Sequence, residues 1–523
     1  MNVIRIFLGI VMIVSSSTYV QSMNNADKQQ SEQYIYYSQY GALGDGVTDD
    51  FDAIIKAHNA ANEAGLPVRA DAGATYYICS TNKTAQIQTS TYWGNAKFII
   101  DDSKIDVENR KSQVFNVSSK LPSTSVTTVT SLKKNQEKLD LSLKCNSFII
   151  VTDNTTMQYI REGINQNNGQ PQTDVFVVDE HGNVDMKAPI IWNYNQITNM
   201  TAYPIETETL TISGGFFTTI ANQLEVTTLY PYYARGINIS RSNLVIDGLY
   251  HDIKGELDYG APYGGFITVS NCTEVTVQNC LLSGHKVYWA NGSAGVPVPL
   301  GTYDITVNRS TNVTFRNCKQ INDIHDTKLW GIFGSNFSKN ITLESVVFSR
   351  FDAHMGVANA TIRNSILGHQ GINLIGCGIF FIENTKVCGS SFINLRSDYG
   401  STWDGDIIIQ NCEFVPRNGA QSDVILINGS YSGQHDFGYT CFMPEKIMIN
   451  GLIIDDINHP DDYLGPKIFA PFNNEYTNNA FVEKYPYVIT KEIEIKNLSI
   501  KSGKSFIKSN NPFMFRNVKI TEK

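Results

Sequence analysis

The sequence predicts an all-β solenoid, in which short parallel strands are stacked one above another. The main observation is a phrase that recurs eleven times: an apolar residue, then a polar residue, then a turn former. Successive phrases are 19 to 46 residues apart, and each combines strand alternation with a turn, which is typical of a coiled stack. The phrases end at Gly214, Gly248, Asn279, Asn317, Ser345, Asn364, Asn384, Asn411, Gly451, Asn497 and Asn517.

Two physical arguments support this stack. Parallel strands laid on one another bury a continuous column of Ile, Val, Leu and Phe, with rungs roughly 4.8 Å apart. Asn at the end of a phrase tolerates a left-handed backbone and can hydrogen-bond to the Asn of the next coil. Longer coils, such as 279–317 and 451–497, must extrude loops. We therefore expect a rod whose long groove suits a polymer.

Composition narrows the class of partner. The chain has 523 residues, with 26 Tyr and 26 Phe, which suits a β-rich protein with rings that stack on sugars. Its net charge of −9 and the lack of a basic stretch argue against nucleic acid. An acidic polysaccharide remains possible if the cations gather in the groove. We expect a monomer.

The first 22 residues resemble an export signal. Arg5 precedes an apolar run, and Val20 and Ser22 occupy the −3 and −1 positions of a cleavage site. The apolar run is short for a membrane span, and we find no other candidate span. We therefore expect a bacterial protein that is secreted or periplasmic, with no membrane insertion.

The nine cysteines allow two interpretations. An exported protein can form a disulfide framework. However, Cys280, Cys318 and Cys412 each directly follow the Asn of a phrase, which favours burial in the core as small apolar side chains.

A family resemblance appears near the N-terminus. The segment Tyr40-Gly-Ala-Leu-Gly-Asp-Gly-Val-Thr-Asp-Asp50, followed by a helical stretch to Gly65, resembles the opening signature of the pectate-lyase-like right-handed parallel β-helix proteins. The resemblance implies a right-handed parallel β-helix whose N-terminal helix, capped by Asp49 or Asp50, closes the core column. This superfamily includes lyases, hydrolases, epimerases and phage tailspikes, so the fold does not decide the function.

The predicted domains follow from these features. Residues 34–104 form the cap and the first coils, and residues 205–523 form the main β-helix. Between them, residues 105–204 contain alternating segments that predict a small inserted antiparallel β subdomain. Its segment 159–165 is interpreted either as reaching toward the groove or as part of a module that stiffens the N-terminal end.

Candidate functional residues cluster after the strands of the middle coils. Five of the nine histidines fall in such segments, and stacking would bring several onto one face. A single His in a turn is more often structural, but five in one region favour a site. The candidate catalytic residues are His325, Lys328, His354, Arg396 and Tyr399. The candidate substrate-binding residues are His285, Lys286, Tyr288, Trp330, Arg350, His369 and Trp403. His251 also belongs to the cluster of five.

Two chemistries compete for these residues, beside a non-catalytic carbohydrate-binding solenoid. Elimination from a uronic-acid polymer needs cations or donors at the carboxylate, a base for the C5 proton and an acid for the C4 oxygen. Hydrolysis needs two suitably placed carboxylic groups, for which five aspartates are available: Asp326, Asp352, Asp398, Asp404 and Asp406. The sequence lacks the Asn-Thr-Asp and Asp-Asp motifs of polygalacturonase-type hydrolases, so the lyase hypothesis leads.

By resemblance, the chain looks like a bacterial polysaccharide lyase for glycosaminoglycan or pectin-like substrates. The roles that we assign are His354 or Tyr399 as base, His325 or Tyr399 as acid, and Arg396 with Lys328 at the carboxylate. We expect no cofactor. Ca²⁺ is a minor alternative, since some relatives use it to bridge the uronate carboxylate, and Asp398, Asp404 and Asp406 could supply oxygens.

Overall fold

A computed structural model describes residues 33–163, 166–224, 232–256, 260–291, 295–419, 423–431 and 435–522. The chain divides into two units, Met1–Tyr34 and Ile35–Lys523, and the second contains the whole fold described below. The predicted export signal, residues 1–22, lies outside the described residues. Within the described ranges, no helix has the length and apolarity needed to cross a bilayer.

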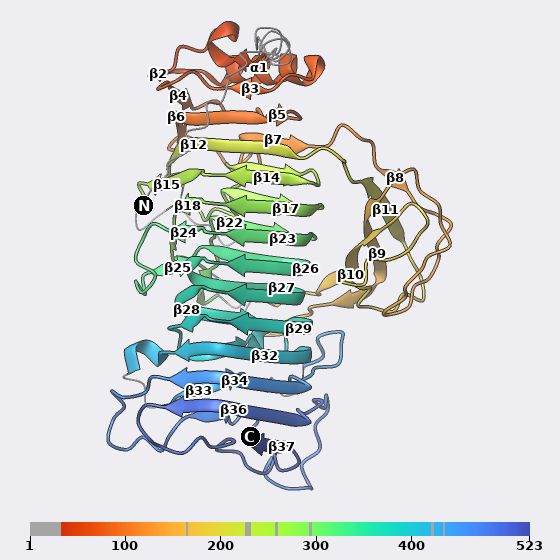
Figure 1. Cartoon of the computed structure of the whole chain (residues 1–523), viewed down its shortest axis with the longest axis vertical. Helices are drawn as coiled ribbons and strands as arrows, with labels where there is room; N and C mark the ends of the chain where they lie inside the picture. Colours follow the sequence, from red (N-terminus) through yellow and green to blue (C-terminus); the bar gives the residue numbers. More distant parts are fainter. Residues whose placement is uncertain are drawn as a thin grey trace, which may run out of the picture. The chain divides into compact units, whose positions relative to one another are not determined.

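The unit Ile35–Lys523 is a parallel β-helix, which confirms the predicted fold class (Figure 1). Each coil passes through three sheet faces, here named A, B and C in the order in which the chain crosses them. Face A contains β5 (Ala85–Ile87), β7 (Phe115–Ser118), β13 (Ile237–Ser240), β16 (Ile267–Ser270), β22 (Ile305–Asn308), the start of β26 (Phe333–Glu344), the middle of β27 (Val347–Arg363), the end of β28 (Ile366–Leu374), β31 (Ser391–Leu395), β33 (Ile425–Asn428) and β35 (Lys467–Phe469).

Face B carries the recurring phrases. It contains β1 (Ile35–Tyr36), β3 (Val68–Arg69), the starts of β6 (Thr91–Asp101) and β12 (Leu210–Ile220), β14 (Leu244–Asp247), β17 (Thr273–Gln278), β23 (Thr311–Arg316), the ends of β26 and β27, β29 (Gly376–Glu383), the starts of β32 (Trp403–Phe414), β34 (Lys446–Ile454) and β36 (Glu492–Ile500), and β37 (Lys519–Glu522).

Face C completes each coil. It contains β2 (Asp45–Asp49), β4 (Thr75–Ile78), β15 (Tyr250–Lys254), β18 (Leu281–Leu282), β24 (Lys319–Gln320), β30 (Lys386–Val387), the starts of β27 and β28, and the ends of β6, β12, β32, β34 and β36. The C-to-A loops form two small antiparallel pairs: β19 (His285–Lys286) pairs with β25 (Leu329–Gly331) of the next loop, and β20 (Tyr288–Asn291) forms a hairpin with β21 (Pro297–Leu300).

The phrases behave as the repetition predicts, with one exception. Asn279, Asn317 and Asn384 have positive φ, and the amide of Asn317 donates to Asn279 at 3.3 Å in the coil before it. The turn between faces B and C therefore selects Asn for its backbone and for its ladder of amides. The last phrase is different: residues 515–517 lie in a turn, and the final strand β37 begins after them.

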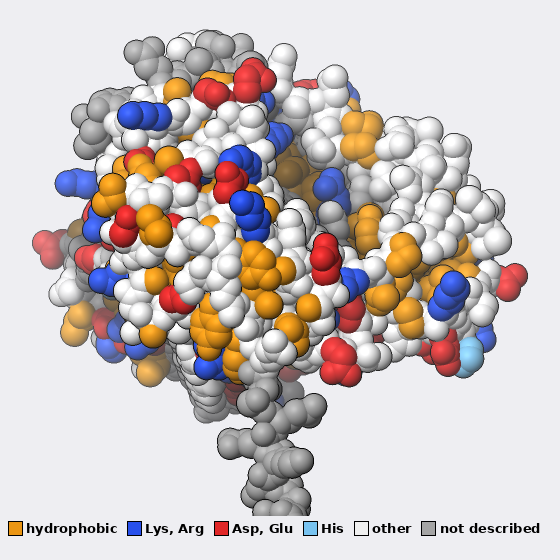
Figure 2. Space-filling model, turned by 90° about the horizontal axis from the view of Figure 1, so that it is seen from above, with side chains coloured by type: hydrophobic (Ala, Val, Ile, Leu, Met, Phe, Trp, Pro, Cys, Tyr) orange, Lys and Arg blue, Asp and Glu red, His pale blue; other side chains and the backbone are white. Residues whose placement is uncertain are grey.

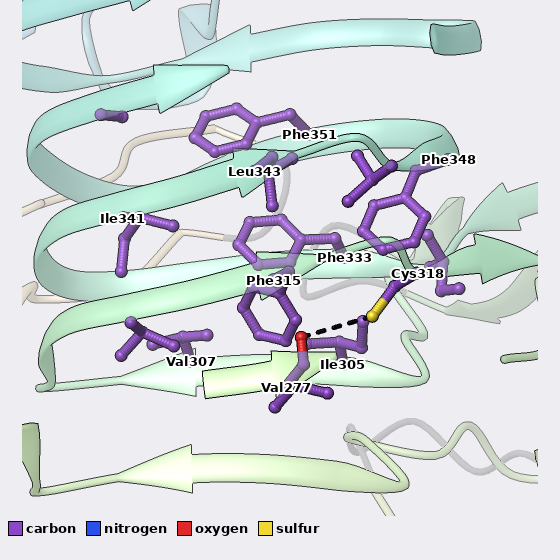
Figure 3. Packing of buried hydrophobic residues seen from close by; sticks show 14 of the residues in the cluster. Val277, Ile305, Val307, Phe315, Cys318, Phe333, Ile341, Leu343, Phe348 and Phe351 are labelled. Carbon is purple, nitrogen blue, oxygen red and sulfur yellow. Dashed lines mark hydrogen bonds between the residues drawn. The ribbon is translucent and has the colours of Figure 1, made fainter. Parts of the chain in front are cut away.

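A column of apolar side chains fills the stack (Figure 3). Phe315, Phe333 and Phe351 from successive coils pack with ring centroids 5.4 Å apart in both pairs. Cys318 lies in the same column, with its thiol directed at the carbonyl oxygen of Val277 at 3.4 Å. All nine cysteines are free, and those that follow a phrase Asn are buried, which confirms the core interpretation.

The N-terminal helix α1 (Phe51–Ala64) covers the first coil, as predicted. Its apolar side, including Phe51 and Ile54, is fully buried in the core column. Asp50 occupies the N-cap position, but its carboxylate accepts the N–H groups of Leu43 (2.7 Å) and Gly44 (3.1 Å) instead of helix donors. The aspartate therefore joins the Gly-rich turn to the helix start.

The inserted module is an antiparallel sheet of four strands in the order β10-β9-β11-β8. Its strands are β8 (Thr124–Ser125), β9 (Ser147–Gln158), β10 (Gln170–Val178) and β11 (Asn199–Pro204). The module begins later than the predicted boundary at residue 105, because β7 at 115–118 is still a coil strand paired with β13. It has its own core, in which Ile149 and Phe176 are fully buried.

Candidate active site

A cavity of about 540 Å³ opens on face A beside the inserted module. We name it the His354 pocket. The module contributes Arg161, Gln166 and Asn167 to its lining; the C-to-A loops contribute Tyr303 and Trp330; face A contributes Asn336 and His354; and Arg396 follows β31. The module segment around residue 161 thus reaches the groove, which was one of its two interpretations.

His354 has a defined tautomer in this pocket. Asn336 donates its side-chain amide to Oδ1 of Asn308 at 2.8 Å, so its own Oδ1 is left to face the imidazole. The distance from His354 Nδ1 to this oxygen is 3.1 Å, which makes Nδ1 the donor. Burial and then the charge of Arg396 lower the pKa of His354 to about 4. The ring is therefore neutral near pH 7, and Nε2 carries a lone pair.

Two aspartates behind the lining of the pocket are fixed by cations. Asp352 is completely buried and accepts Arg396 Nη1 at 2.8 Å, Arg350 Nη2 at 2.7 Å and the Tyr303 hydroxyl at 2.6 Å. Burial alone would raise the pKa of Asp352, but Arg350 and Arg396 lower it below its usual value. Asp352 is therefore an ionised structural group.

The second aspartate, Asp398, is held in the same way from the other side. Arg396 donates to it at 2.8 and 3.1 Å, and Arg161 forms an ion pair with it. Burial opposes ionisation, yet Arg396 and Arg161 lower the pKa of Asp398 strongly. Neither carboxyl can keep a proton at neutral pH.

Charge and aromatic contacts complete the pocket. The three guanidinium groups of Arg161, Arg350 and Arg396 face only two carboxylates, so this group carries one net positive charge while His354 is neutral. Arg161 lies over the Tyr399 ring at 4.5 Å, and Arg350 lies over the Trp330 ring at 4.5 Å. An anionic group of a ligand would balance this charge.

Tyr303 is the phenol that lines the pocket and also touches Asp352. Burial and then the neighbouring Asp352 raise the pKa of Tyr303 well above its usual value. The phenol thus keeps its proton at neutral pH, as a general acid must. Tyr399 lies behind the pocket instead, almost fully buried with its ring 5.4 Å from that of His354.

The five predicted histidines do not form one cluster. His325 and His369 line a different cavity of about 690 Å³ farther along face A, here named the His369 pocket. The two cavities occupy adjacent rungs, because β27, which carries His354, is paired with β28, whose Asn373 lines the His369 pocket. His354 is therefore separated from both of these imidazoles.

The remaining two histidines are buried in what we call the Asp304 network. His251 Nδ1 lies 2.8 Å from Asp304, and His285 lies 3.0 Å from the same carboxylate and 3.1 Å from Glu256. Tyr288 donates to Glu256 at 2.7 Å. These side chains are nearly inaccessible, so His285 and Tyr288 do not line the His354 pocket.

Other predicted residues also lie elsewhere. Trp403 is fully buried in the core, since it starts β32 on face B and its indole N–H points to the carbonyl of Asp406 at 3.3 Å. Lys328 is exposed in the loop before β25. Lys286 lies over the Tyr288 ring at 4.4 Å. The pocket thus gathers His354, Arg396 and Trp330, with Arg350 and Tyr399 directly behind them.

The aspartates considered for Ca²⁺ do not converge. Asp398 is held by Arg396 and Arg161, whereas Asp404 pairs with Lys134 of the module at 2.8 Å. Among the described residues, no group of three or more His, Cys, Asp or Glu side chains could hold a metal ion. This donor set therefore does not fit a Ca²⁺ site.

Sequence reasoning missed three residues of the pocket: Arg161 as an ion-pair partner, Tyr303 and Asn336. The asparagine pair Asn308 and Asn336 did carry a signal, because both end face A strands that are paired in register. Tyr303 lies in a C-to-A loop, and the periodicity of strands does not predict where a loop side chain lies. Arg161 meets Asp398 across 237 residues of sequence, a separation that no local pattern reports.

Comparisons with known proteins agree on the fold. No family model matches the sequence. An uncharacterized 65.4 kDa protein in the cps region of Klebsiella pneumoniae is 30% identical over 80 residues, and this match covers 15% of the chain and 14% of that protein. The chain therefore aligns with about one seventh of that curated relative.

Solved structures of phage tailspikes resemble most of the chain. Tailspike gp61 of Pseudomonas phage phi297 has a TM-score of 0.54 at 11% identity, over 91% of this chain and 82% of its own. The gp54 tailspike of Acinetobacter baumannii bacteriophage AP22, in complex with A. baumannii capsular saccharide, has a TM-score of 0.51 at 10% identity, over 96% and 80%. At these identities the likeness shows the parallel β-helix fold alone.

Proposed function

We propose that this protein is a polysaccharide lyase that cleaves a uronic-acid polymer by β-elimination in the His354 pocket. One observation carries the proposal: a neutral imidazole with a fixed tautomer lies beside a cluster of arginines with a net positive charge. Elimination needs this pair of features, because the carboxylate must be neutralised while a nearby base removes the C5 proton.

The chain supplies a residue for each step. Arg161 and Arg396 bind the uronate carboxylate, which lowers the cost of developing negative charge at C5. His354 Nε2 accepts the C5 proton, the bond between C4 and O4 breaks, and the C4–C5 double bond forms. Tyr303 breaks its hydrogen bond to Asp352 and gives that proton to O4 as the leaving chain departs. The products are an unsaturated uronate and a new sugar hydroxyl.

Hydrolysis is less well supported by the same geometry. A glycoside hydrolase needs one carboxylic acid that stays protonated to assist the leaving group. Asp352 and Asp398 are both held ionised by guanidinium groups, so neither provides that proton. The hydrolase therefore ranks second to the lyase.

The fold and its neighbours support a polysaccharide as the ligand. The His354 and His369 pockets lie on adjacent rungs of face A, as a site for an extended chain requires. The AP22 tailspike, which shares the fold, was solved with a capsular saccharide. We propose an acidic polysaccharide substrate, relation to the pectate-lyase-like superfamily, action as a monomer, and export directed by residues 1–22.

The test is absorbance near 235 nm, which reports the unsaturated product. The purified protein is offered chondroitin, dermatan, hyaluronan, pectate and alginate. We expect a rise with at least one polymer, and a loss of about 100- to 10,000-fold in kcat for His354→Ala, the range for a general base. His181→Ala is the matched control, because His181 is an exposed histidine in a turn of the module.

The other outcomes separate the alternatives. New reducing ends without the absorbance would identify a hydrolase and refute the lyase. Measurable polymer binding with neither signal would identify a non-catalytic carbohydrate-binding solenoid. Full activity in His354→Ala would remove this residue from the mechanism.

A further inference from the structure

A third cavity lies on the seam between the inserted module and the stack. Its volume is about 370 Å³, and we name it the seam pocket. Trp192 and Asn193 of the module line one side, and Cys377 and Tyr439 of the stack line the other. Figure 2, which looks along the stack, shows the surface hollowed between these two parts. Cavities of this size at such junctions commonly bind small ligands.

Aromatic side chains form one wall of the seam pocket. The rings of Trp192 and Tyr439 have centroids 6.2 Å apart and planes inclined by 30°. Tyr159 meets Tyr439 edge-on at 5.2 Å, and its hydroxyl lies beside Gly356 of the cavity wall. Tyr159 is buried, whereas Trp192 and Tyr439 are partly exposed and offer a flat apolar surface for the C–H face of a sugar ring.

The charged residues that line the seam pocket are paired with one another. Lys134 meets Asp404 at 2.8 Å, and the buried Lys339 meets Asp174 at 2.6 Å. Among the described lining residues, two cations thus face two anions. The seam pocket has no excess charge, in contrast to the His354 pocket, so its geometry favours an uncharged ligand.

Amide groups give the seam pocket its hydrogen-bonding capacity. Gln158 donates to Gln172 at 3.0 Å, and Gln172 donates to the carbonyl oxygen of Asn193 at 3.0 Å. Amides both donate and accept, as the hydroxyl groups of a sugar do. An aromatic wall combined with amides and balanced charges suits a neutral sugar better than an anion or a purely apolar molecule.

We infer that the seam pocket binds a neutral pyranose unit, separately from the acidic unit bound in the His354 pocket. The inference rests on the proposed function in so far as the ligand is a polysaccharide. It assigns the inserted module a second role: the module both completes the His354 pocket through Arg161 and supplies Trp192 to a site for an uncharged sugar.

In the experiment, the full chain is titrated with the methyl glycosides of glucose, galactose and N-acetylglucosamine, and binding is measured by calorimetry. Methyl glucuronoside serves as the acidic comparison. We expect at least one neutral glycoside to bind, with affinity reduced at least about tenfold in Trp192→Ala. Tyr159→Phe, which keeps the ring packing, should weaken binding by about threefold to tenfold, the effect of one hydrogen bond.

Trp289→Ala is the matched control, since Trp289 is an exposed tryptophan of the β20–β21 hairpin, and its binding should equal that of the wild type. The inference is overturned if no neutral glycoside binds, or if both Trp192→Ala and Tyr159→Phe bind normally. The assay at 235 nm, run in parallel, keeps the two proposals apart. Unsaturated product without glycoside binding would refute only the seam pocket, and the reverse result would refute only the lyase.

Discussion

The His354 pocket and the Asp304 network both place imidazoles close to carboxylates, yet they give opposite protonation. In the pocket, burial and Arg396 lower the pKa of His354 to about 4. In the network, burial works against the charged ring, but Glu256 and Asp304 raise the pKa of His285 to about 10. One ring is a neutral base, and the other is a cation.

The difference lies in what neutralises the carboxylates. In the pocket, guanidinium groups already pair with Asp352 and Asp398, so no negative charge is left to hold a proton on His354. In the network, the imidazoles are the partners of Asp304. The protonation of the histidines in these two sites therefore differs because the carboxylates near His354 already have guanidinium partners.

The largest expected effect is on stability, when a carboxylate of the Asp304 network is removed. Asp304→Asn should lower the free energy of unfolding by about 3–5 kcal/mol, because it removes one of the two carboxylates that neutralise the buried His285 cation and the carboxylate that His251 contacts. Urea unfolding followed by circular dichroism measures the loss. The control is Asp179→Asn in an exposed turn of the module. An unchanged unfolding midpoint in Asp304→Asn would contradict the charged state of His285.

The second effect is on activity at low pH. A base must be unprotonated, so kcat/KM should be constant above the pKa of His354 and should fall about tenfold per pH unit below about 4. Initial rates at 235 nm between pH 3 and pH 8, in buffers where the fold is intact, measure this acid limb of the pH profile, that is, the fall of kcat/KM at low pH. A limb near pH 6.5 would show that the arginines do not depress the pKa.

A smaller effect is expected from the residue that positions His354. Asn336→Ala should lower kcat by about threefold to tenfold through loss of one hydrogen bond. Asn336→Asp should instead move the acid limb to higher pH, because a carboxylate favours the protonated ring. A structural role alone would leave the pH profile in place, so an unmoved limb would refute the positioning role.

A further effect is a loss of stability at alkaline pH. The folded pKa of His285, about 10, exceeds its unfolded value of about 6.5. Its contribution is therefore complete below pH 6.5 and is lost as the pH rises toward 10. Urea midpoints at pH 6 and pH 9.5 should differ more in the wild type than in His285→Gln. If the two midpoints differ equally in the wild type and in His285→Gln, a group other than His285 causes the loss of stability at alkaline pH.

The sequence could predict the stack because its signal is local and repeated. Each phrase predicts a strand, a turn and a core side chain. Asn317 at the turn and Cys318 in the core are examples. The site was predicted only in part. From the sequence, each histidine is placed only by its distance from a face B phrase, so residues of face C and of the following loop are not distinguished. In the structure, His251 lies on face C and His325 lies in a loop. The length of the loops varies from coil to coil, and it determines where the histidines after each phrase lie.

The inserted module precedes in the chain the coils that it contacts. Its sheet is complete by residue 204, but its partners Asp398 and Asp404 lie nearly two hundred residues later, in coils that are synthesised afterwards. Arg161 can therefore form its ion pair with Asp398 only once these later coils exist. The His354 pocket is therefore completed only after the chain has been synthesised as far as Arg396 and Asp398.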